Sequence, residues 1–210
     1  EPILGKVKTR LAQGITAEST LILYQAFIKD VAHLCLSTPV DARFLYYAAP
    51  TQKIPFLDQF RKQFILQRQE GQDLGERMLR CFQQCKKEGY EKVVVIGSDC
   101  LTMTSEDVIK AFKVLDDHDY VIGPSTDGGF YLIGAHKPHK TMFHHVQWGG
   151  ETTFQQTYKN LTALQQKIFT LMPKSDIDRI DDLYTFAKEV ENKRTALYTK
   201  AALNDICKNF

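Results

Sequence analysis

The carboxylate of Asp99 directly follows a short and strongly apolar run. Residues 93–96 are Val-Val-Val-Ile, and Gly97 and Ser98 end the run before the acid. Such β-branched runs are typical of a central strand buried on both faces of a parallel sheet, and open α/β sheets bind ligands beyond the carboxyl ends of their strands. A carboxylate there needs a partner, and in a phosphate-handling site the usual partner is a divalent cation. The alternative is that Asp99 only caps the next helix.

Three cations stand close together near the start of the chain. Lys6, Lys8 and Arg10 follow Gly5 and precede a segment with helical periodicity. Glycine lets a phosphate approach the backbone, and the cations supply charge-assisted hydrogen bonds to its oxygens. In an extended segment these alternate positions share one face, so all three could point at one anion. The alternative is a basic, solvated arm.

The segment 123–129, Gly-Pro-Ser-Thr-Asp-Gly-Gly, separates two apolar runs and carries another acid. Gly128 and Gly129 allow a tight turn in which Asp127 projects above the sheet and a ligand can approach the backbone. Asp-Gly is also an ordinary hairpin turn, but the residues ahead of Asp127 make this loop longer than a minimal hairpin requires. We predict that Asp127, Gly128 and Gly129 bind substrate, and that Asp127 binds metal or acts as a general base.

Two further segments are each compatible with ligand binding or with an ordinary structural role. Asp73 stands before a helical stretch with Glu76 three residues on, which makes a capping box, but backbone N–H groups there and Arg77 also suit a nucleotide base or ribose. Trp148 is the only tryptophan and stands ahead of another helix. It either stacks on a substrate or anchors that helix in the core. The sequence leaves both pairs of alternatives open.

The elements that must position these residues alternate between helix and strand. Apolar residues recur at spacings of three and four in the predicted helices, and short β-branched or aromatic runs mark the strands. No Pro-, Gly- or Ser-rich linker divides the chain, so we expect a single α/β domain over residues 1–210. Predicted helices cover 16–35, 73–88, 104–115, a stretch from about 151, 183–190 and a tail from about 195; predicted strands cover 44–48, 64–66, 93–96, 120–122, 130–133 and 168–171.

One strand of the expected sheet is not found in the sequence. A phosphate-binding loop of this kind normally follows a strand, and none stands ahead of Gly5. We therefore expect the natural protein to have a strand before Glu1. With it, the predicted fold is a three-layer α/β/α sandwich around a mixed, mostly parallel central sheet.

Composition argues against several classes of partner and location. The formal net charge is +2, which gives no electrostatic reason to expect nucleic acid, and no apolar run approaches the ~20 residues of a membrane span. No secretory signal peptide is visible. The five cysteines form no regular framework, and Cys81 and Cys85 lack a second pair at metal-binding spacing. We expect a reducing, cytoplasmic location.

Four segments carry a family pattern, in this order along the chain: Pro2-Ile-Leu-Gly-Lys-Val-Lys-Thr-Arg-Leu11, Gly71-Gln-Asp-Leu-Gly-Glu-Arg-Met78, Gly97-Ser-Asp-Cys-Leu101 and Gly123-Pro-Ser-Thr-Asp-Gly-Gly-Phe-Tyr-Leu-Ile-Gly134. Together they resemble a bacterial family of poorly characterised, glycosyltransferase-A-like proteins. That family is grouped with the nucleotide-diphospho-sugar transferases and is similar to the guanylyltransferase that activates 2-phospholactate. The resemblance extends to residues 177–183. It implies the fold, but this fold hosts both nucleotidyl and glycosyl transfer.

The resemblance also implies roles for individual residues. The Gly-Ser-Asp motif of the family matches residues 97–99, so Asp99 is the expected metal-binding carboxylate. Related nucleotidyltransferases take a second metal ligand from the first residue of an Asn/Asp-Thr-Pro-Glu-Asp-Leu pattern. Here residues 178–183 read Asp-Arg-Ile-Asp-Asp-Leu, so Asp178 inherits that role although Thr and Pro are replaced. Helix N-capping is the alternative for Asp178, and acids at 176 and 181 lie near enough in sequence to be confused with it.

The leading functional hypothesis is a metal-dependent transferase with a nucleoside triphosphate or nucleotide-sugar donor and a small-molecule acceptor. Mg²⁺ or Mn²⁺ held by Asp99 and Asp178 would bridge the donor's phosphate oxygens. Lys8 and Arg10 would act on the same oxygens. On this hypothesis Asp99, Asp127 and Lys8 are the catalytic residues.

The alternative hypothesis is a nucleotide-binding module without turnover that acts through a partner. A binding module has no need of three acids around one anionic ligand, which favours the enzyme. Within the enzyme class, glycosyl transfer usually needs an Asp-x-Asp pattern, and the residue two after Asp99 is Leu101. The sequence therefore favours nucleotidyl transfer modestly.

Overall fold

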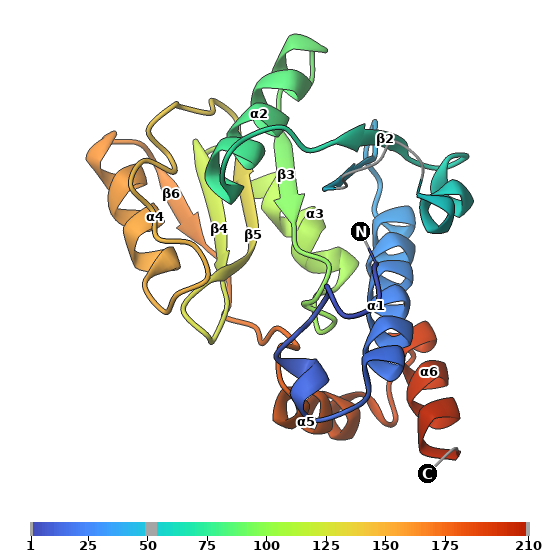
Figure 1. The fold of residues 1–210 in the computed structure, drawn as a ribbon. Coiled ribbons are helices and arrows are strands. Elements are labelled where there is room, and N and C mark those ends of the chain that lie inside the picture. Colours follow the sequence, from blue (N-terminus) through green and yellow to red (C-terminus); the bar gives the residue numbers. More distant parts are fainter. Residues whose placement is uncertain (1, 49–53, 209–210) are drawn as a thin grey trace.

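The computed structural model describes residues 2–48 and 54–208 of the chain. Helices and strands alternate along it as predicted, and each element predicted within these residues is present (Figure 1). Two short 3-10 helices, η1 and η2, were not predicted from the sequence. In chain order the elements are η1 (Leu11–Gln13), α1 (Ala17–Ser37), β1 (Phe44–Tyr47), η2 (Pro55–Phe60), β2 (Ile65–Arg68), α2 (Leu74–Lys87), β3 (Val93–Ile96), α3 (Ser105–Val114), β4 (Tyr120–Pro124), β5 (Phe130–Ala135), α4 (Thr153–Ala163), β6 (Ile168–Thr170), α5 (Ile180–Val190) and α6 (Leu197–Lys208).

The strands in the described part of the chain form two separate sheets. β1 and β2 pair in parallel, with Phe44 opposite Ile65. The larger sheet has the order β3-β5-β4-β6. In it β4 and β6 are parallel, whereas β5 runs antiparallel to both β3 and β4. The larger sheet is therefore mixed, as the predicted fold class requires, and the smaller one is parallel.

The predicted place of β3 at the centre of a parallel sheet is wrong for the described residues. β3 pairs antiparallel with β5, from Val93 opposite Ala135 to Ile96 opposite Leu132. Its other edge has no strand partner among residues 2–48 and 54–208, and three of its four residues are only partly buried. The apolar run identified the strand correctly, but it could not give the pairing direction, because both kinds of pairing can bury β-branched side chains.

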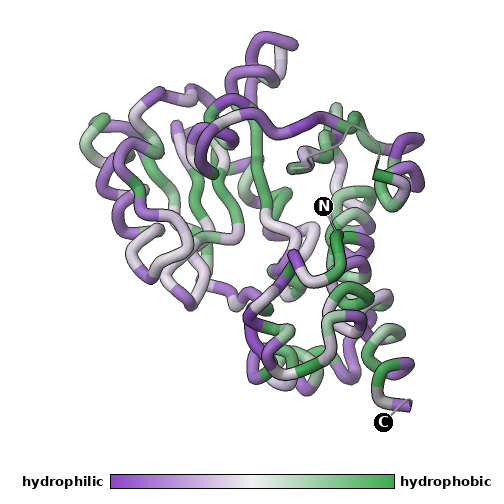
Figure 2. Tube along the Cα trace, in the orientation of Figure 1, coloured by the Kyte–Doolittle hydropathy of each residue, from purple (hydrophilic) through white to green (hydrophobic). Residues whose placement is uncertain are grey.

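Helices cover both faces of the larger sheet. On one face, Tyr120 and Ile122 of β4 pack with Phe82 of α2 and Leu161 of α4. On the other face, Val121 of β4 packs against the apolar side of α3. β4 contributes to both cores because successive side chains of a strand point to opposite faces. The strands are accordingly mostly hydrophobic in Figure 2, and the arrangement is the predicted three-layer sandwich.

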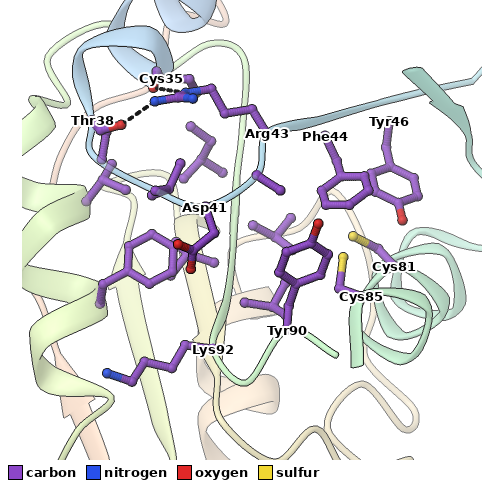
Figure 3. A pocket seen from close by; sticks show the side chains of 18 of the residues that line it. Cys35, Thr38, Asp41, Arg43, Phe44, Tyr46, Cys81, Cys85, Tyr90 and Lys92 are labelled. Carbon is purple, nitrogen blue, oxygen red and sulfur yellow. Dashed lines mark hydrogen bonds between the residues drawn. The ribbon is translucent and has the colours of Figure 1, made fainter. Parts of the chain in front are cut away.

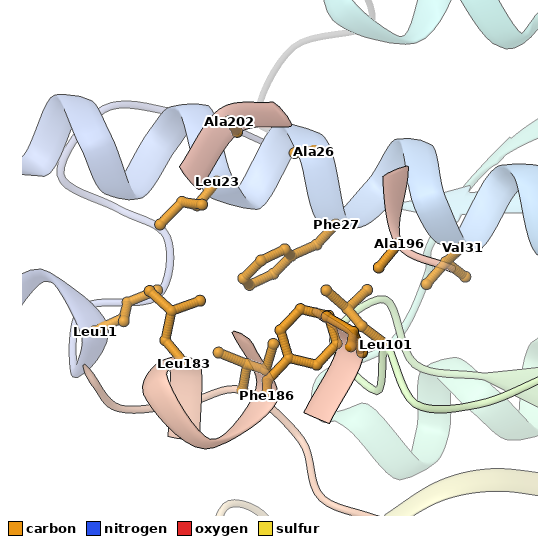
Figure 4. Close-up of a cluster of buried hydrophobic side chains, with 12 residues drawn as sticks. Leu11, Leu23, Ala26, Phe27, Val31, Leu101, Leu183, Phe186, Ala196 and Ala202 are labelled. Carbon is orange, nitrogen blue, oxygen red and sulfur yellow. The ribbon is translucent and has the colours of Figure 1, made fainter. Parts of the chain in front are cut away.

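A further core, made mainly by helices, joins distant parts of the chain (Figure 4). It brings together the segment after residue 10, the loop after β3 and the start of α5. Buried members of this core include Leu11 from η1, Phe27 from α1, Leu101 from the loop after β3 and Leu183 from α5.

None of the helices in the described residues has the length and apolarity needed to cross a membrane.

Candidate functional site

Lys8 is the centre of a cluster of charged side chains beyond the carboxyl end of β3. Its ammonium nitrogen lies 2.8 Å from Asp99 Oδ2 and 2.6 Å from Asp178 Oδ1, and only 8% of its side chain is exposed. Arg10 approaches the same acid from outside, with Nη1 3.1 Å from Asp178 Oδ2. The structure therefore joins both predicted metal ligands to two predicted phosphate ligands, across as many as 170 residues of sequence.

The backbone around this cluster holds each side chain in place. Lys8 has φ of +45°, in the left-handed region that side-chain-bearing residues rarely adopt. Asp99 accepts a hydrogen bond at its backbone carbonyl from the N–H of Ile177 (3.1 Å), which holds the segment with Asp178 against this loop. Gly97 leaves room for the carboxylate, because a Cβ there would lie 2.9 Å from Asp99 Oδ1.

The capping alternative for Asp178 is not what the structure has. The N–H groups at the start of α5 are satisfied by Asp182, whose Oδ2 accepts hydrogen bonds from the backbone N–H groups of Asp178 (3.0 Å) and Arg179 (2.7 Å). The carboxylate of Asp178 is thus free to pair with the two cations of the cluster.

Lys8 and Asp178 each shift the pKa of the other in favour of its charged form. Burial by itself would lower the pKa of the Lys8 ammonium, but the carboxylates of Asp99 and Asp178 outweigh this and raise that pKa above its ordinary value. Burial would likewise raise the pKa of Asp178, but Lys8 and then Arg10 hold it below its ordinary value. Lys8 therefore remains protonated and Asp178 ionised at neutral pH.

Asp176 is a functional candidate that the sequence analysis did not assign. Its Oδ1 atom is buried and has no hydrogen-bond partner among the described residues. Burial, followed by the charges of Asp99 and Asp127, raises the pKa of this carboxyl group to about 7. A buried carboxylate oxygen without a donor is unfavourable unless it is protonated or meets a cation. The available sequence signal was its Asp-x-Asp spacing with Asp178, which puts two acids on one side of an extended segment.

The turn between β4 and β5 is held by hydrogen bonds to Asp127. Its Oδ1 accepts from the hydroxyl of Ser125 (2.5 Å) and from the N–H of Gly129 (2.9 Å). Gly128 has φ of +90°, and a Cβ there would lie 2.1 Å from the carbonyl oxygen of Glu151. This glycine is thus needed for chain packing, whether or not a ligand approaches. The exposed side chain of Asp127 acts on the pKa of the buried acid described above, so it lies at the edge of the same cluster.

The predicted extended conformation of residues 6–10 is wrong. Gly5 has φ of +72° in a turn that is closed by a hydrogen bond from the N–H of Lys6 to the carbonyl of Ile3 (3.0 Å). The side chain of Lys6 is exposed, and the ion pairs of the cluster involve Lys8 and Arg10 instead. The local turn separates the three cations, so only two of them meet at the acids.

Asp73 and Arg77 make the contacts expected of a helix start. Asp73 caps α2, because its Oδ1 accepts a hydrogen bond from the N–H of Glu76 at 2.7 Å. Arg77 donates from Nε to the carbonyl of Gly71 at 3.1 Å. The capping alternative is therefore realised, and a role of these two residues in nucleotide binding stays a prediction.

Trp148 packs as a core residue. Its ring lies 6.3 Å from that of Phe130 and 5.8 Å from that of Phe143, measured between centroids. A Cβ at Gly75 would lie 2.6 Å from Trp148 Cζ2, so the indole also fits closely against the first turn of α2. Its Nε1 atom is buried and has no partner among the described residues. Contact with a substrate stays a prediction.

The carboxylates of Asp99 and Asp178 have the chemistry of a divalent-cation site. Mg²⁺ and Mn²⁺ prefer hard oxygen ligands, and these side chains are 32% and 34% exposed, within reach of solvent ions. The charge of Asp99 acts on the carboxyl group of Asp176, whose Oδ1 is buried and has no partner among the described residues. In the described part of the chain, no group of three or more His, Cys, Asp or Glu residues has a metal-binding arrangement. The oxygens of Asp99 and Asp178 could supply two protein ligands, and Mg²⁺ in phosphate-handling sites is bound through one or two carboxylates together with substrate phosphates.

Residues 31–150 match the model of a family described as uncharacterized proteins conserved in bacteria (DUF2064). The chain belongs to this family. The matched region contains Asp99 and Asp127, whereas Lys8 and Asp178 lie on either side of it. No curated protein matches the sequence.

Three solved structures are similar in fold to this chain. The chain is similar to a "putative nucleotide-diphospho-sugar transferase" from Desulfovibrio desulfuricans G20, with a TM-score of 0.84, 29% identity, and coverage of 97% of this chain and 90% of that one. It is also similar to a CMP:2-keto-3-deoxy-manno-octonic acid synthetase complexed with CTP (TM-score 0.54, 10% identity, 80% of this chain and 88% of that one). A cytidylyltransferase from Leptospira borgpetersenii serovar Hardjo-bovis (strain JB197) has a TM-score of 0.53 at 14% identity, over 89% and 83% of the two chains. These matches confirm the predicted nucleotide-diphospho-sugar transferase fold.

Proposed function

We propose that the protein is a metal-dependent transferase that uses a nucleoside triphosphate or a nucleotide sugar as donor. The observation that carries this proposal is the position of Lys8, buried between Asp99 and Asp178 beyond the carboxyl end of β3. Two acids and two cations at that edge suit a diphosphate and its divalent cation. Solved structures of the same fold are named as nucleotide-diphospho-sugar transferase and cytidylyltransferase, which supports the same class of donor.

On the donor side, Asp99 and Asp178 hold the cation, while Lys8 and Arg10 bind the phosphate oxygens. Bound Mg²⁺ or Mn²⁺ supplies positive charge that offsets the charge on the diphosphate. Each charge-assisted hydrogen bond from Lys8 or Arg10 contributes about 1.5–3 kcal/mol. Without a donor, the Lys8 ammonium and the Arg10 guanidinium together balance the two carboxylates.

On the acceptor side, Asp127 stands on the exposed turn between β4 and β5. We assign it the role of orienting the acceptor and taking its proton as a general base. Gly128 and Gly129 keep that turn tight beside the acceptor. Asp73 and Arg77, at the start of α2, are assigned to the base or ribose of the donor.

Within this class we favour nucleotidyl transfer. Leu101 stands two residues after Asp99, where an Asp-x-Asp pattern would have its second acid, and only 4% of Leu101 is exposed because it packs in the helical core. This position therefore contributes packing in place of a metal ligand. The sequence resemblance to the guanylyltransferase that activates 2-phospholactate points to the same chemistry.

The proposal is tested by thermal shift with nucleoside triphosphates and nucleotide sugars, each with and without Mg²⁺ or Mn²⁺. A donor at 100 times its dissociation constant stabilises the folded state by ~2.7 kcal/mol. Asp99→Asn is expected to remove the metal-dependent shift and keep the fold, whereas Asp181→Asn, at an exposed acid of α5, is expected to keep the shift. The absence of any shift with either metal would contradict the proposal. Binding without pyrophosphate or nucleoside diphosphate release, across a panel of acceptors, would favour the non-catalytic alternative.

A further inference from the structure

Lys174 is a largely buried cation that lies outside the ion pairs around Lys8. It belongs to the connection between β6 and α5, which leads away from the larger sheet (Figure 1), and only 18% of its side chain is exposed. Its ammonium nitrogen lies 3.0 Å from Asp107 Oδ2 in the first turn of α3 and donates to the carbonyl of Thr102 at 3.2 Å in the loop after β3. Lysine side chains are seldom buried unless they are paired, so these two acceptors fix the place of the ammonium.

The main chain of Lys174 is bound to the turn between β4 and β5. Its N–H donates to the carbonyl of Pro124 at 3.1 Å, and its carbonyl accepts a hydrogen bond from the N–H of Thr126 at 2.9 Å. The two bonds form a parallel bridge between Ser125 and Lys174. Lys174 therefore holds the loop after β3 through its side chain and the turn after β4 through its main chain.

Each of the three segments that meet at Lys174 carries an acid of the candidate site. Asp99 stands in the loop after β3, Asp127 in the turn after β4, and Asp178 in the connection to α5. One further hydrogen bond joins the first and the last of these segments, from the N–H of Ile177 to the carbonyl of Asp99 at 3.1 Å. Lys174 is thus bound to all three segments and lies four residues before Asp178.

We propose that Lys174 is a positioning residue that sets the distance between the carboxylates of Asp99 and Asp178, and with it their affinity for a divalent cation. This inference rests on the proposed function, which supplies the cation. Mg²⁺ binds its oxygen ligands at about 2 Å in a nearly ideal octahedron, so a small shift of one carboxylate away from the other loses a ligand. The ammonium prevents such a shift, because the connection to α5 cannot move away from the loop after β3 unless both contacts break.

The start of α3 does not depend on Lys174. The Oδ2 atom of Asp107 also accepts hydrogen bonds from the backbone N–H and the hydroxyl of Thr104, both at 2.8 Å, and Asp107 and Thr104 complete a capping box. Removal of the ammonium therefore leaves the helix start in place and releases the connection to α5.

The proposal is tested with Lys174→Met, which keeps the length of the side chain but removes its charge. In calorimetric titration with Mn²⁺ alone, the dissociation constant is expected to rise about 10-fold, at the lower end of the range for residues that support metal ligands from behind. Amide hydrogen exchange gives a second readout that needs no metal. The amide of Ile177, which is bonded to Asp99, is expected to exchange at least about 10-fold faster in the variant.

Lys200→Met is the matched control. The ammonium of Lys200 is also partly buried, and it donates to three main-chain carbonyls at and just beyond the end of α5, away from the loops that carry the acids. This variant is expected to lose stability but to keep the Mn²⁺ affinity and the exchange rate of the Ile177 amide. Lys174→Arg keeps a charged donor for both acceptors and is expected to restore most of the Mn²⁺ affinity.

Three results would overturn the proposal. They are wild-type exchange of the Ile177 amide in Lys174→Met, a loss of Mn²⁺ affinity no larger than that of Lys200→Met, and a loss of affinity that Lys174→Arg does not reduce. Wild-type Mn²⁺ affinity in Lys174→Met would contradict this inference alone, and the proposed function would stand. A wild-type protein that binds no Mn²⁺ would contradict both.

Discussion

The charged cluster around Lys8 and the cavity beside β3 adjoin the same strand, but they differ in which polar groups have no partner. In the cluster, side chains from distant parts of the sequence balance each other's charge, and the unmet group is one carboxylate oxygen of Asp176. The cavity, lined by residues of β1, β3, α2 and α3 (Figure 3), has mostly apolar side chains, and the buried hydroxyl of Tyr46 there has no hydrogen-bond partner among the described residues.

This difference determines which kind of ligand each region can bind. Charge acts over several ångströms in any direction, so the cluster suits mobile anions and cations such as a diphosphate with its metal. Apolar side chains attract only the atoms that they touch, so the cavity cannot select charged ligands in the same way. Substitutions in the cluster should therefore change ligand binding most, and substitutions in the cavity should change stability only.

The largest effect is expected for Asp178→Ala. The substitution removes one of the two carboxylates that hold the buried Lys8, and this carboxylate also pairs with Arg10. We expect metal-dependent donor binding to fall more than about 100-fold and the free energy of unfolding to fall by about 2–3 kcal/mol. Calorimetric titration and urea denaturation measure the two effects. Asp181→Ala, at an exposed acid three residues further along in α5, is the control, and equal losses in both variants would break the assignment.

A smaller effect, dependent on pH, is expected for Asp176→Asn in metal-free buffer. The carboxyl group titrates near 3.8 when unfolded and at about 7 in the folded protein. Between these values the folded protein keeps a proton that the unfolded chain has released. The wild-type protein should therefore lose about 2–3 kcal/mol of stability through this group between pH 5 and pH 8.

Asparagine cannot ionise, so the variant lacks this loss. Its free energy of unfolding relative to wild type should rise by that amount from pH 5 to pH 8, as measured by urea denaturation at both values. A difference that is the same at both pH values would show that Asp176 is not the buried, unpartnered acid of the cluster.

Local patterns in the sequence predicted the elements well, because each pattern depends on neighbours only a few residues apart. The helix starts at Asp73 and Thr104 are examples: both side chains cap their helices as the spacing indicates. The pairing of β3 was not predictable in this way. It depends on β5, which lies more than 30 residues further along the chain.

The candidate site shows the same limit. The acids at 99 and 178 were predicted from motifs, and the structure joins them through Lys8. Lys6 was predicted on spacing that holds only in an extended segment, and the turn at Gly5 removes it from the ion pairs. Asp176 was not assigned because its burial arises from tertiary packing, which no local pattern shows.

A smaller effect again, on ligand binding, is expected for Lys8→Met. Methionine keeps the length of the side chain but removes its charge, so donor binding should weaken by about 10- to 100-fold through the lost contacts to phosphate. Without a donor, Mn²⁺ binding should strengthen, because no ammonium then competes for the two carboxylates. Lys62→Met, at an exposed lysine outside the cluster, is the control. Weaker Mn²⁺ binding in Lys8→Met would contradict the competition between lysine and metal.

The smallest effect is expected for Tyr46→Phe in the cavity. The hydroxyl of Tyr46 is buried and has no hydrogen-bond partner among the described residues, so its removal should change stability by less than about 0.5 kcal/mol. Tyr120→Phe is the matched comparison, because its hydroxyl donates to the carbonyl of Lys137 at 2.9 Å. That variant should lose about 1 kcal/mol, as measured by urea denaturation. A loss of similar size in Tyr46→Phe would mean that this hydroxyl has a hydrogen-bond partner, for which the neighbouring thiols of Cys81 and Cys85 are the candidates.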